Sequence, residues 1–174
     1  MLAMSAAAEI VELLAKVVGP QRALTEDAIA EDYTHDEALT ATARRPLALV
    51  LPRSTEEVSE ILALANEHRC PVTARGSGTG LSGAAIPSAG GILVSFEQMD
   101  QVLEIDTVNH VAVVQPGVTL EKLEEATAAR GLAYQVYPGE YSASLGGNVA
   151  TNAGGMRAVK YGVTRHQVLG LEAV

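Results

Sequence analysis

The chain has 174 residues, of which 48% are hydrophobic and 19% are charged. This composition excludes an intrinsically disordered chain, and the length is enough for one domain with a substantial core. The 21 Asp and Glu exceed the 12 Lys and Arg, and the formal net charge of −9 argues against a general binder of nucleic acid or acidic membranes. The single cysteine, Cys70, excludes a disulfide framework and a multi-cysteine metal site.

Residues 1–45 predict an N-terminal helical arm. Apolar residues up to Val18 fall on one helical face, and Gly19-Pro20 ends that helix. Charged residues interrupt the apolar run and no basic stretch precedes it, so we expect no signal peptide, no transmembrane segment and a cytoplasmic location. A second short helix is predicted over Thr25–Tyr33 with Thr25 as its N-cap, followed by an extended connection over 38–45.

From residue 46 onward, strands and helices alternate in a way that is typical of an α/β fold. A capping box at Ser54–Glu57 begins a helix whose inner face holds Val58, Ile61, Leu62 and Ala65, and strands flank this helix in a parallel β-α-β unit. A second capped helix runs from Thr119 to Arg130, with Gly131 after it. The predicted strands are 46–51, 71–74, 91–96, 102–106, 110–115 (a hairpin with its predecessor), 132–136 and 168–174.

The last predicted strand has no turn, cap or polar tail after it. We therefore expect the chain to be the N-terminal part of a longer protein, and residues 46–174 to be an incomplete domain.

Residues 75–83 (RGSGTGLSG) form the first of two glycine-rich windows. Three glycines match the spacing of the dinucleotide fingerprint, but that fingerprint needs a helix, which the following AAIPSAGG cannot form. No Lys-Ser or Lys-Thr follows, which excludes a P-loop. The window predicts an irregular loop whose backbone amides form an anion-binding nest, with Ser77, Thr79 and Ser82 as further donors.

Residues 138–155 (PGEYSASLGGNVATNAGG) form the second window, which Tyr161-Gly162 closes. Its small residues allow a ligand to approach the backbone, and its amide side chains can bond ligand oxygens. Three basic residues, Arg157, Lys160 and Arg165, lie close by in the sequence. The structural alternative for both windows is a pair of ordinary glycine-rich turns with surface bases.

The two windows, together with KYG at 160–162 and PLALVLPRSTEEVSEIL at 46–62, resemble the FAD-binding domain of the vanillyl-alcohol-oxidase superfamily. The nearest branch is that of the FAD-linked oxidases, which includes the flavin subunit of bacterial glycolate oxidase and the D-lactate dehydrogenases. The resemblance covers residues 25–174 and is more specific for FAD than for a substrate.

The resemblance implies an α+β (α/β) fold of the PCMH type, in which two subdomains hold an extended FAD between them. The first window would bind the pyrophosphate, and the second would follow the ribityl chain and the flavin. Members with covalent flavin carry a His in the first window, and this chain has none there, so non-covalent FAD is implied. The implied cofactor-binding residues are Arg75, Gly76, Ser77, Gly78, Thr79, Gly80, Leu81, Ser82, Pro138, Gly139, Ser144, Gly146, Gly147, Asn148, Thr151, Asn152, Gly154, Gly155, Tyr161 and Gly162.

The implied activity is that of an FAD-dependent oxidoreductase of 2-hydroxy acids, of the glycolate or D-lactate type. A hydride would pass from the substrate Cα to flavin N5 with the help of a general base. Such enzymes carry their catalytic His and Arg in a substrate cap domain, so no catalytic residue is assigned here and the isolated chain is expected to be inactive. The family's Asp-Pro-Ser-Ser stretch is replaced by residues 138–142, which leaves the exact acid open.

The implied partners are a small 2-hydroxy acid and an iron–sulfur subunit that accepts electrons, with no nucleic acid. A truncated sheet would expose an unpaired edge, so we also expect self-association into a homo-oligomer.

Several side chains and functions remain as alternatives. The four histidines, His35, His68, His110 and His166, share no ligand spacing, so no metal site is predicted. Tyr134, Tyr137 and Tyr141 either border the flavin or pack the preceding strand. The chain could instead be a stand-alone or truncated flavin-binding module without catalysis. A third alternative, a flavoenzyme similar to enolpyruvyl-sugar reductase, predicts NADPH oxidation and no activity on hydroxy acids.

Overall fold

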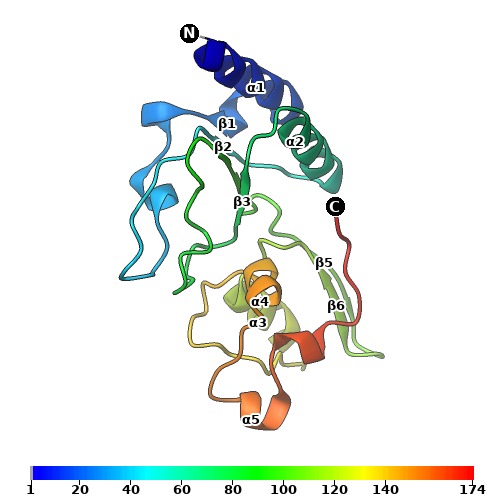
Figure 1. Ribbon diagram of the computed structural model, residues 1–174. Coiled ribbons are helices and arrows are strands. Elements are labelled where there is room, and N and C mark those ends of the chain that lie inside the picture. The colour runs from blue at the N-terminus through cyan, green and yellow to red at the C-terminus, as the bar shows by residue number, and fades with distance from the viewer. Residues whose placement is uncertain (1) are drawn as a thin grey trace. The chain divides into compact units, whose positions relative to one another are not determined.

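The computed structural model describes residues 2–174, with side chains from residue 7 onward (Figure 1). The chain divides into two compact units, Met1–Gln98 together with Val174, and Met99–Ala173. Each unit contains helices and strands, which confirms the predicted mixed α and β class. Among the described helices, none is long and apolar enough to cross a bilayer.

The first unit is built on a four-stranded sheet. Its strands are β1 (Ala23–Leu24), β2 (Ala48–Val50), β3 (Val72–Arg75) and β4 (Ile92–Ser95), in the order β1-β2-β4-β3. β2, β4 and β3 run parallel, while β1 pairs antiparallel with β2. The predicted β-α-β connection is therefore present, but β4 lies between its two strands.

Two helices, α1 (Leu2–Val18) and α2 (Thr55–Glu67), pack on one face of this sheet (Figure 1). Their buried side chains form one cluster with alternate residues of the central strands: Ile10, Leu14, Val18, Ile61 and Ala65 with Ala48, Val50, Ile92 and Val94. Because side chains alternate along a strand, Leu49 and Leu93 point to the other face and pack with Ile29. The predicted inner face of α2 is confirmed at Val58, Ile61 and Ala65, whereas Leu62 is only half-buried. The strand predicted over 46–51 is present as the fully buried β2.

The second unit begins with the predicted hairpin, β5 (Val102–Asp106) and β6 (Val111–Val114). The next helix, α3 (Leu120–Ala128), has Thr119 as its N-cap, and Gly131 after it has a φ of +72°. Val118, Leu120, Leu123, Ala143 and Leu145 form the core of this unit. Two short helices follow, α4 (Leu145–Thr151) and α5 (Ala158–Tyr161).

The predicted helix over Thr25–Tyr33 is wrong. The segment forms two 3₁₀ turns, Glu26–Ala28 and Glu31–Thr34, and the Thr25 side chain makes no cap hydrogen bond. The Arg45 guanidinium instead binds the carbonyl oxygens of Glu26 and Ile29. The Glu26 carbonyl also accepts from the Ile29 amide, three residues on, which is the spacing of a 3₁₀ turn. Ile29 is only 2% exposed in the core.

Two predicted strands are also absent from the described part of the chain. Residues 132–136 and 168–174 have no ladder partner there, although Val136 is buried. Leu169 and Leu171 are instead 81% and 71% exposed, so the apolar pattern of the last segment covers no core. A strand needs a neighbouring strand for its backbone hydrogen bonds, and an apolar pattern alone does not provide one.

Candidate functional site

The first window is a loop in the first unit that connects β3 with β4. Residues 76–90 contain bends and turns but neither helix nor strand, which confirms the predicted irregular loop. Ser77, Gly80, Leu81 and Ser82 are exposed, whereas Gly76, Gly78 and Thr79 are half-buried. The predicted residues of this window thus lie together, after a strand end, with their backbone accessible.

The amides of this loop are free for a ligand. Within the described structure, no protein acceptor receives a hydrogen bond from the backbone N–H groups of Gly76 to Ala84. The next amide, that of Ala85, donates to the Asp36 carboxylate. A run of unpaired amides in an irregular loop is the feature that an anion-binding nest requires.

Arg75 lies beneath the loop and does not extend from it. The residue is 7% exposed, and its guanidinium donates to the backbone oxygens of His35 at 2.6 Å and Asp32 at 2.7 Å. A Cβ at Gly78, where φ is +76°, would overlap this guanidinium. Gly78 is therefore required because the loop backbone rests directly on the Arg75 side chain.

The charge of Arg75 is not neutralised by a direct ion pair among the described residues, although acidic groups lie near it. Burial lowers the pKa of its guanidinium, while Tyr33, Asp36 and Glu97 act in the opposite direction. The guanidinium lies 5.6 Å from the centre of the Tyr33 ring, and no ion pair of Arg75 occurs among the described residues. A buried cation just under unpaired amides raises the positive potential at the loop and favours an anion there.

The second window is only partly a loop. The structure shows the seven-residue helix α4 within it, which the sequence did not predict. The Ser144 hydroxyl caps α4 by accepting from the Gly147 N–H at 3.3 Å, and the Thr151 hydroxyl donates back to the Gly147 carbonyl. Asn152 ends the helix in the left-handed conformation at φ +50°, and its side-chain oxygen accepts from the Arg165 amide.

Several glycines of this window are explained by packing within the second unit. A Cβ at Gly146 would come within 2.7 Å of Pro116, and one at Gly155 would overlap the Tyr137 carbonyl. A Cβ at Gly162 would overlap the His166 ring. Gly139 differs, because a Cβ there would meet open space and glycine is favoured only by the backbone φ of +113°. These contacts give structural reasons for glycine at three positions, and their roles toward FAD stay predictions.

Asn148 holds the one buried, unpartnered polar side-chain atom found in the described part of the protein. The residue is 5% exposed in α4, and its Nδ2 has no hydrogen-bond partner. A buried donor of this kind needs an acceptor to offset its lost hydration. An oxygen- or nitrogen-rich ligand in the second window would supply one.

The tyrosines near the second window contact one another and a neighbouring arginine side chain. The Tyr137 and Tyr141 rings lie 4.4 Å apart between centroids, and Arg157 lies 5.8 Å from the centre of the Tyr137 ring. Burial raises the pKa of Tyr134, which packs against the core of the second unit. Tyr134 and Tyr137 are thus partly buried against the core of the second unit, and the strand that they were expected to pack does not form within the described residues.

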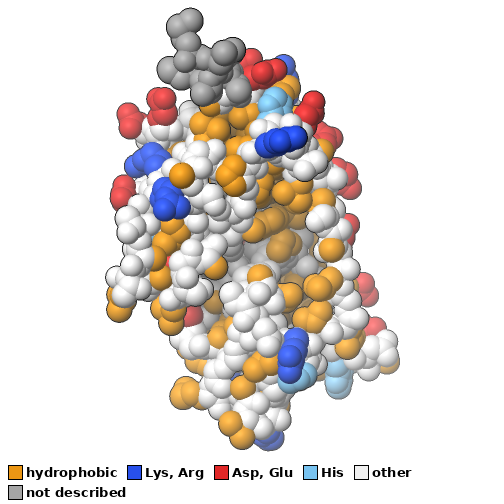
Figure 2. All heavy atoms as spheres, in the orientation of Figure 1, with side chains coloured by type: hydrophobic (Ala, Val, Ile, Leu, Met, Phe, Trp, Pro, Cys, Tyr) orange, Lys and Arg blue, Asp and Glu red, His pale blue; other side chains and the backbone are white. Residues whose placement is uncertain are grey.

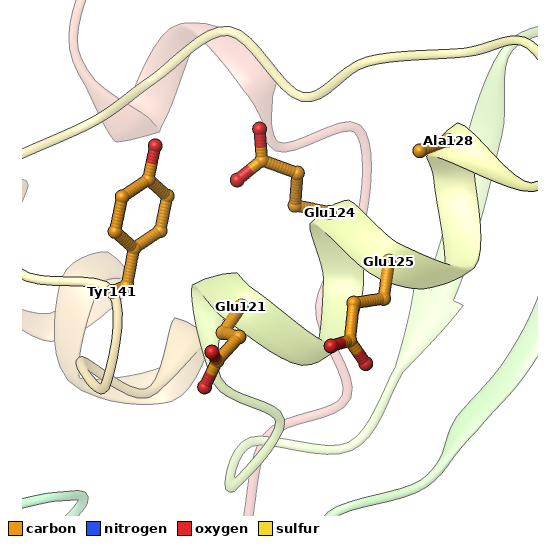
Figure 3. A pocket seen from close by; sticks show the side chains of 5 residues that line it. All are labelled: Glu121, Glu124, Glu125, Ala128 and Tyr141. Carbon is orange, nitrogen blue, oxygen red and sulfur yellow. The ribbon is translucent and has the colours of Figure 1, made fainter.

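A separate hollow of the second unit is acidic. Glu121, Glu124, Glu125 and Ala128 of α3 line it together with Tyr141, and Figure 3 shows the three carboxylates around it. Carboxylates repel phosphate, so this hollow does not suit the anionic half of a dinucleotide. On the face in Figure 2, the Lys and Arg side chains of the described residues are scattered, without the continuous basic stripe of a nucleic-acid binder.

Each window, taken within its own unit, offers donors for a polar or anionic ligand. The free amides above Arg75 suit a pyrophosphate, and the unpartnered Asn148 amide suits a ligand oxygen or ring nitrogen. Among the described residues, no group of His, Cys, Asp and Glu is arranged to hold a metal ion. The chemistry of the donors is thus that of a nucleotide site.

Comparison with known proteins gives the same result. The family model of an FAD binding domain matches residues 46–174. An uncharacterized FAD-linked oxidoreductase of Mycobacterium tuberculosis is 60% identical over 95% of this chain and 36% of its own length. D-lactate dehydrogenase of Anaerostipes hadrus is 46% identical over 91% of the chain and 34% of its own length. Glycolate oxidase subunit GlcD of Bacillus subtilis is 42% identical over 95% of the chain and 35% of its own length.

Solved structures support the fold. An alkyldihydroxyacetonephosphate synthase superposes with a TM-score of 0.81 at 24% identity, over 90% of this chain and 31% of that one. 4-Ethylphenol oxidase from Gulosibacter chungangensis superposes with a TM-score of 0.76 at 26% identity, over 87% of this chain and 30% of that one. The chain spans about a third of the length of the curated relatives it matches. The resemblance found in the sequence is confirmed: the chain belongs to the FAD-binding domain family of the FAD-linked oxidases, and FAD is its cofactor.

Proposed function

We propose that the two glycine-rich windows are the FAD-binding elements of this chain. The amides of Gly76, Ser77, Gly78, Thr79 and Gly80 bind the pyrophosphate, and Arg75 supports them from below. The observation that carries this assignment is the run of backbone N–H groups without a protein acceptor directly above a buried guanidinium. Leu81 and Ser82 extend the same exposed loop.

The second window contributes the donors for the ribityl chain and the flavin. The Asn148 amide is the best supported of these, because it is buried and has no partner. The remaining residues of the window line the ligand by their backbone or fix the shape of the loop: Pro138, Gly139, Ser144, Gly146, Gly147, Thr151, Asn152, Gly154, Gly155, Tyr161 and Gly162. FAD is held non-covalently, since the first window offers no His for a covalent link.

The longer proteins to which this region belongs act, in this proposal, on 2-hydroxy acids of the glycolate or D-lactate type. Two relatives carry these activities in their names, at 42% and 46% identity. FAD supplies the hydride acceptor at flavin N5. Residues 46–174 hold and orient the dinucleotide, and substrate recognition belongs to a cap domain outside the matched region. Residues 1–45 form an N-terminal arm whose helix α1 and strand β1 pack into the first unit. Electrons leave through a partner subunit with an iron–sulfur centre.

An absorbance titration tests the cofactor assignment. The purified chain is titrated with FAD, and acid precipitation then shows whether the flavin is released as free FAD. We expect the flavin absorbance band to shift when FAD binds. We also expect acid precipitation of the protein to release all of the bound flavin as free FAD. A folded chain that leaves the FAD spectrum unchanged at saturating FAD contradicts the assignment of the windows.

Gly80→Ala provides a sharper version of the same test. A Cβ at Gly80 would meet only the Asp36 carboxylate, at 3.7 Å, so the methyl group fits the folded loop. It projects at an amide assigned to the pyrophosphate, and we expect FAD affinity to fall by about tenfold, which corresponds to about 1.4 kcal/mol. Gly170→Ala is the matched control, because a Cβ there meets open space outside both windows. Equal FAD affinities of the two variants would count against the pyrophosphate role of Gly80.

A further inference from the structure

The turn formed by residues 32–38 lies against the first window. The guanidinium of Arg75, at the start of the loop, donates to the backbone oxygens of Asp32 and His35. In the middle of the loop, the Gly80 carbonyl accepts from the Glu37 amide at 2.9 Å. The same short turn therefore holds the loop at two points that are five positions apart in the sequence.

Asp36 adds the third point. The residue is 6% exposed; one carboxylate oxygen accepts from the Ala38 amide at 3.1 Å, and the other accepts from the Ala85 amide at 3.4 Å. The first bond shapes the turn itself, and the second reaches the far end of the loop. A buried carboxylate is stable only when such partners satisfy it, so its position is strongly constrained.

The three contacts leave the amides in between without a protein acceptor. They fix the loop at Arg75, Gly80 and Ala85, while the N–H groups from Gly76 to Ala84 stay unpaired. A loop with so many unpaired amides has little backbone bonding of its own to set its shape. Contacts from other segments therefore help to set its shape, and between Arg75 and Ala85 the hydrogen bonds of this kind come from the turn at 32–38.

We infer that Asp36 is a positioning residue for the FAD pyrophosphate, which acts by holding the amide loop at residues 76–84 in its binding conformation. The segment 32–38 lies outside the region 46–174 that matches the family model, so this inference adds a part of the chain to the FAD site. It rests on the proposed function of the first window. Asp36 does not touch the ligand and acts through the loop.

Asp36→Asn tests the inference first without any ligand. The Ala38 and Ala85 amides bind different oxygens of Asp36, and asparagine has the same shape but an NH₂ donor in place of one of them, so one of the two amides loses its acceptor. Amide hydrogen exchange of the free protein, followed by NMR, is expected to become at least fivefold faster at Ala85 and Glu37. The amides of the central strands β2 and β4 report on global stability and are expected to keep their rates.

Asp106→Asn is the matched control. Asp106 also shapes a turn, in the hairpin of the second unit: its Oδ1 accepts from the Val108 and Asn109 amides, and its Oδ2 accepts from the Asn109 side chain. Asparagine removes one acceptor oxygen here as it does at position 36. The replacement of Asp106 should leave exchange in the first window and the affinity for FAD unchanged. Asp36→Glu is the second variant if Asp36→Asn does not fold, since its longer side chain displaces the oxygens while the charge stays.

FAD titrations of the same proteins complete the test. We expect the dissociation constant to rise by about tenfold for the Asp36 variant and to stay within twofold for the control. Unchanged exchange at Ala85 and Glu37 would overturn the inference, as would faster exchange with unchanged FAD affinity. If the wild-type chain does not bind FAD, the proposed function fails, and the exchange data still decide whether Asp36 holds the loop.

Discussion

Asn148 combines deep burial with a donor that no described residue satisfies. An unsatisfied buried amide costs the free protein about 1–3 kcal/mol of stability. Such a group is expected in a binding site, where a ligand atom accepts its hydrogen bond, because binding sites commonly lower the stability of the free protein. The sequence predicted Asn148 as a ligand residue, and the structure shows a physical reason to expect it.

Asn148→Leu is therefore expected to have opposite effects on stability and binding. Leucine keeps the branched shape and removes the orphaned donor, so the free energy of unfolding of the free protein should rise by about 1 kcal/mol. The affinity for FAD should fall by about tenfold, because a hydrogen bond to the ligand is lost. Urea unfolding without FAD and a flavin titration measure the two effects.

Asn109→Leu is the control for this pair of effects. Asn109 donates to the Asp106 carboxylate in the hairpin turn, so its replacement removes a satisfied hydrogen bond. The variant should be less stable than the wild type and bind FAD equally well. A stability loss in Asn148→Leu with unchanged FAD affinity would indicate that this amide serves only the fold.

Asp36 shows which part of the site the sequence could not provide. The glycine-rich windows could be found from the sequence, because each is a short continuous stretch with many glycines. Asp36 acts through an amide 49 residues away, at Ala85, and nothing in its own neighbourhood signals that contact. Arg75 was predicted as a cofactor-binding residue, and the structure places it under the loop, where its contacts are backbone carbonyls.

At the scale of elements, prediction succeeded where local capping chemistry decides. The N-caps Ser54 and Thr119 begin α2 and α3 as expected, because each hydroxyl accepts an amide of the first turn. α4 was missed because Gly146 and Gly147 are poor helix formers. The helix forms there since Ser144 caps it and the Gly146 backbone packs tightly on Pro116.

The N-terminus of α2 also carries an ion pair whose effect depends on pH. Both terminal nitrogens of the Arg22 guanidinium donate hydrogen bonds to the Glu57 carboxylate, each at 2.7 Å. The two side chains are about one-fifth exposed. The hydrogen bond to Arg22 holds the pKa of Glu57 below its usual range. A lowered carboxyl pKa stabilises the fold above the unfolded-state pKa, and this contribution is lost as the pH falls through the folded-state value.

Glu57→Gln should thus lower the free energy of unfolding by about 1 kcal/mol at pH 7, a modest value because the pair is partly exposed. The difference from the wild type should shrink as the pH falls below about 4, where the Glu57 carboxylate of the unfolded chain takes up its proton. Urea unfolding of the variant and the wild type at pH 7 and at pH 3 measures this difference in the free energy of unfolding. Glu67→Gln, at the exposed opposite end of α2, is the control. A difference that stays constant down to pH 3 would exclude the ionic contribution.

At the scale of the whole molecule, both sheets have edges without a strand partner among the described residues. β3 is an edge strand of the four-stranded sheet, and the two-stranded sheet of β5 and β6 consists only of edges. A two-stranded sheet is marginally stable by itself. Two apolar side chains of this hairpin, Leu103 and Val113, are also 61% and 45% exposed. Unpaired edges with apolar neighbours are surfaces on which a second copy of the chain can add a strand.

We therefore predict that the chain self-associates through the hairpin. Light scattering over a range of concentrations should give a mass that rises above the 18.1 kDa of one chain. Leu103→Lys introduces a charge on the exposed face of the hairpin and should shift the mass toward the monomer, because charge on an edge strand opposes strand addition. Leu169→Lys, at an equally exposed apolar side chain outside the sheets, should leave the mass unchanged. A monomeric mass of the wild type at every concentration contradicts self-association, and an equal effect of both lysines contradicts the hairpin as its site.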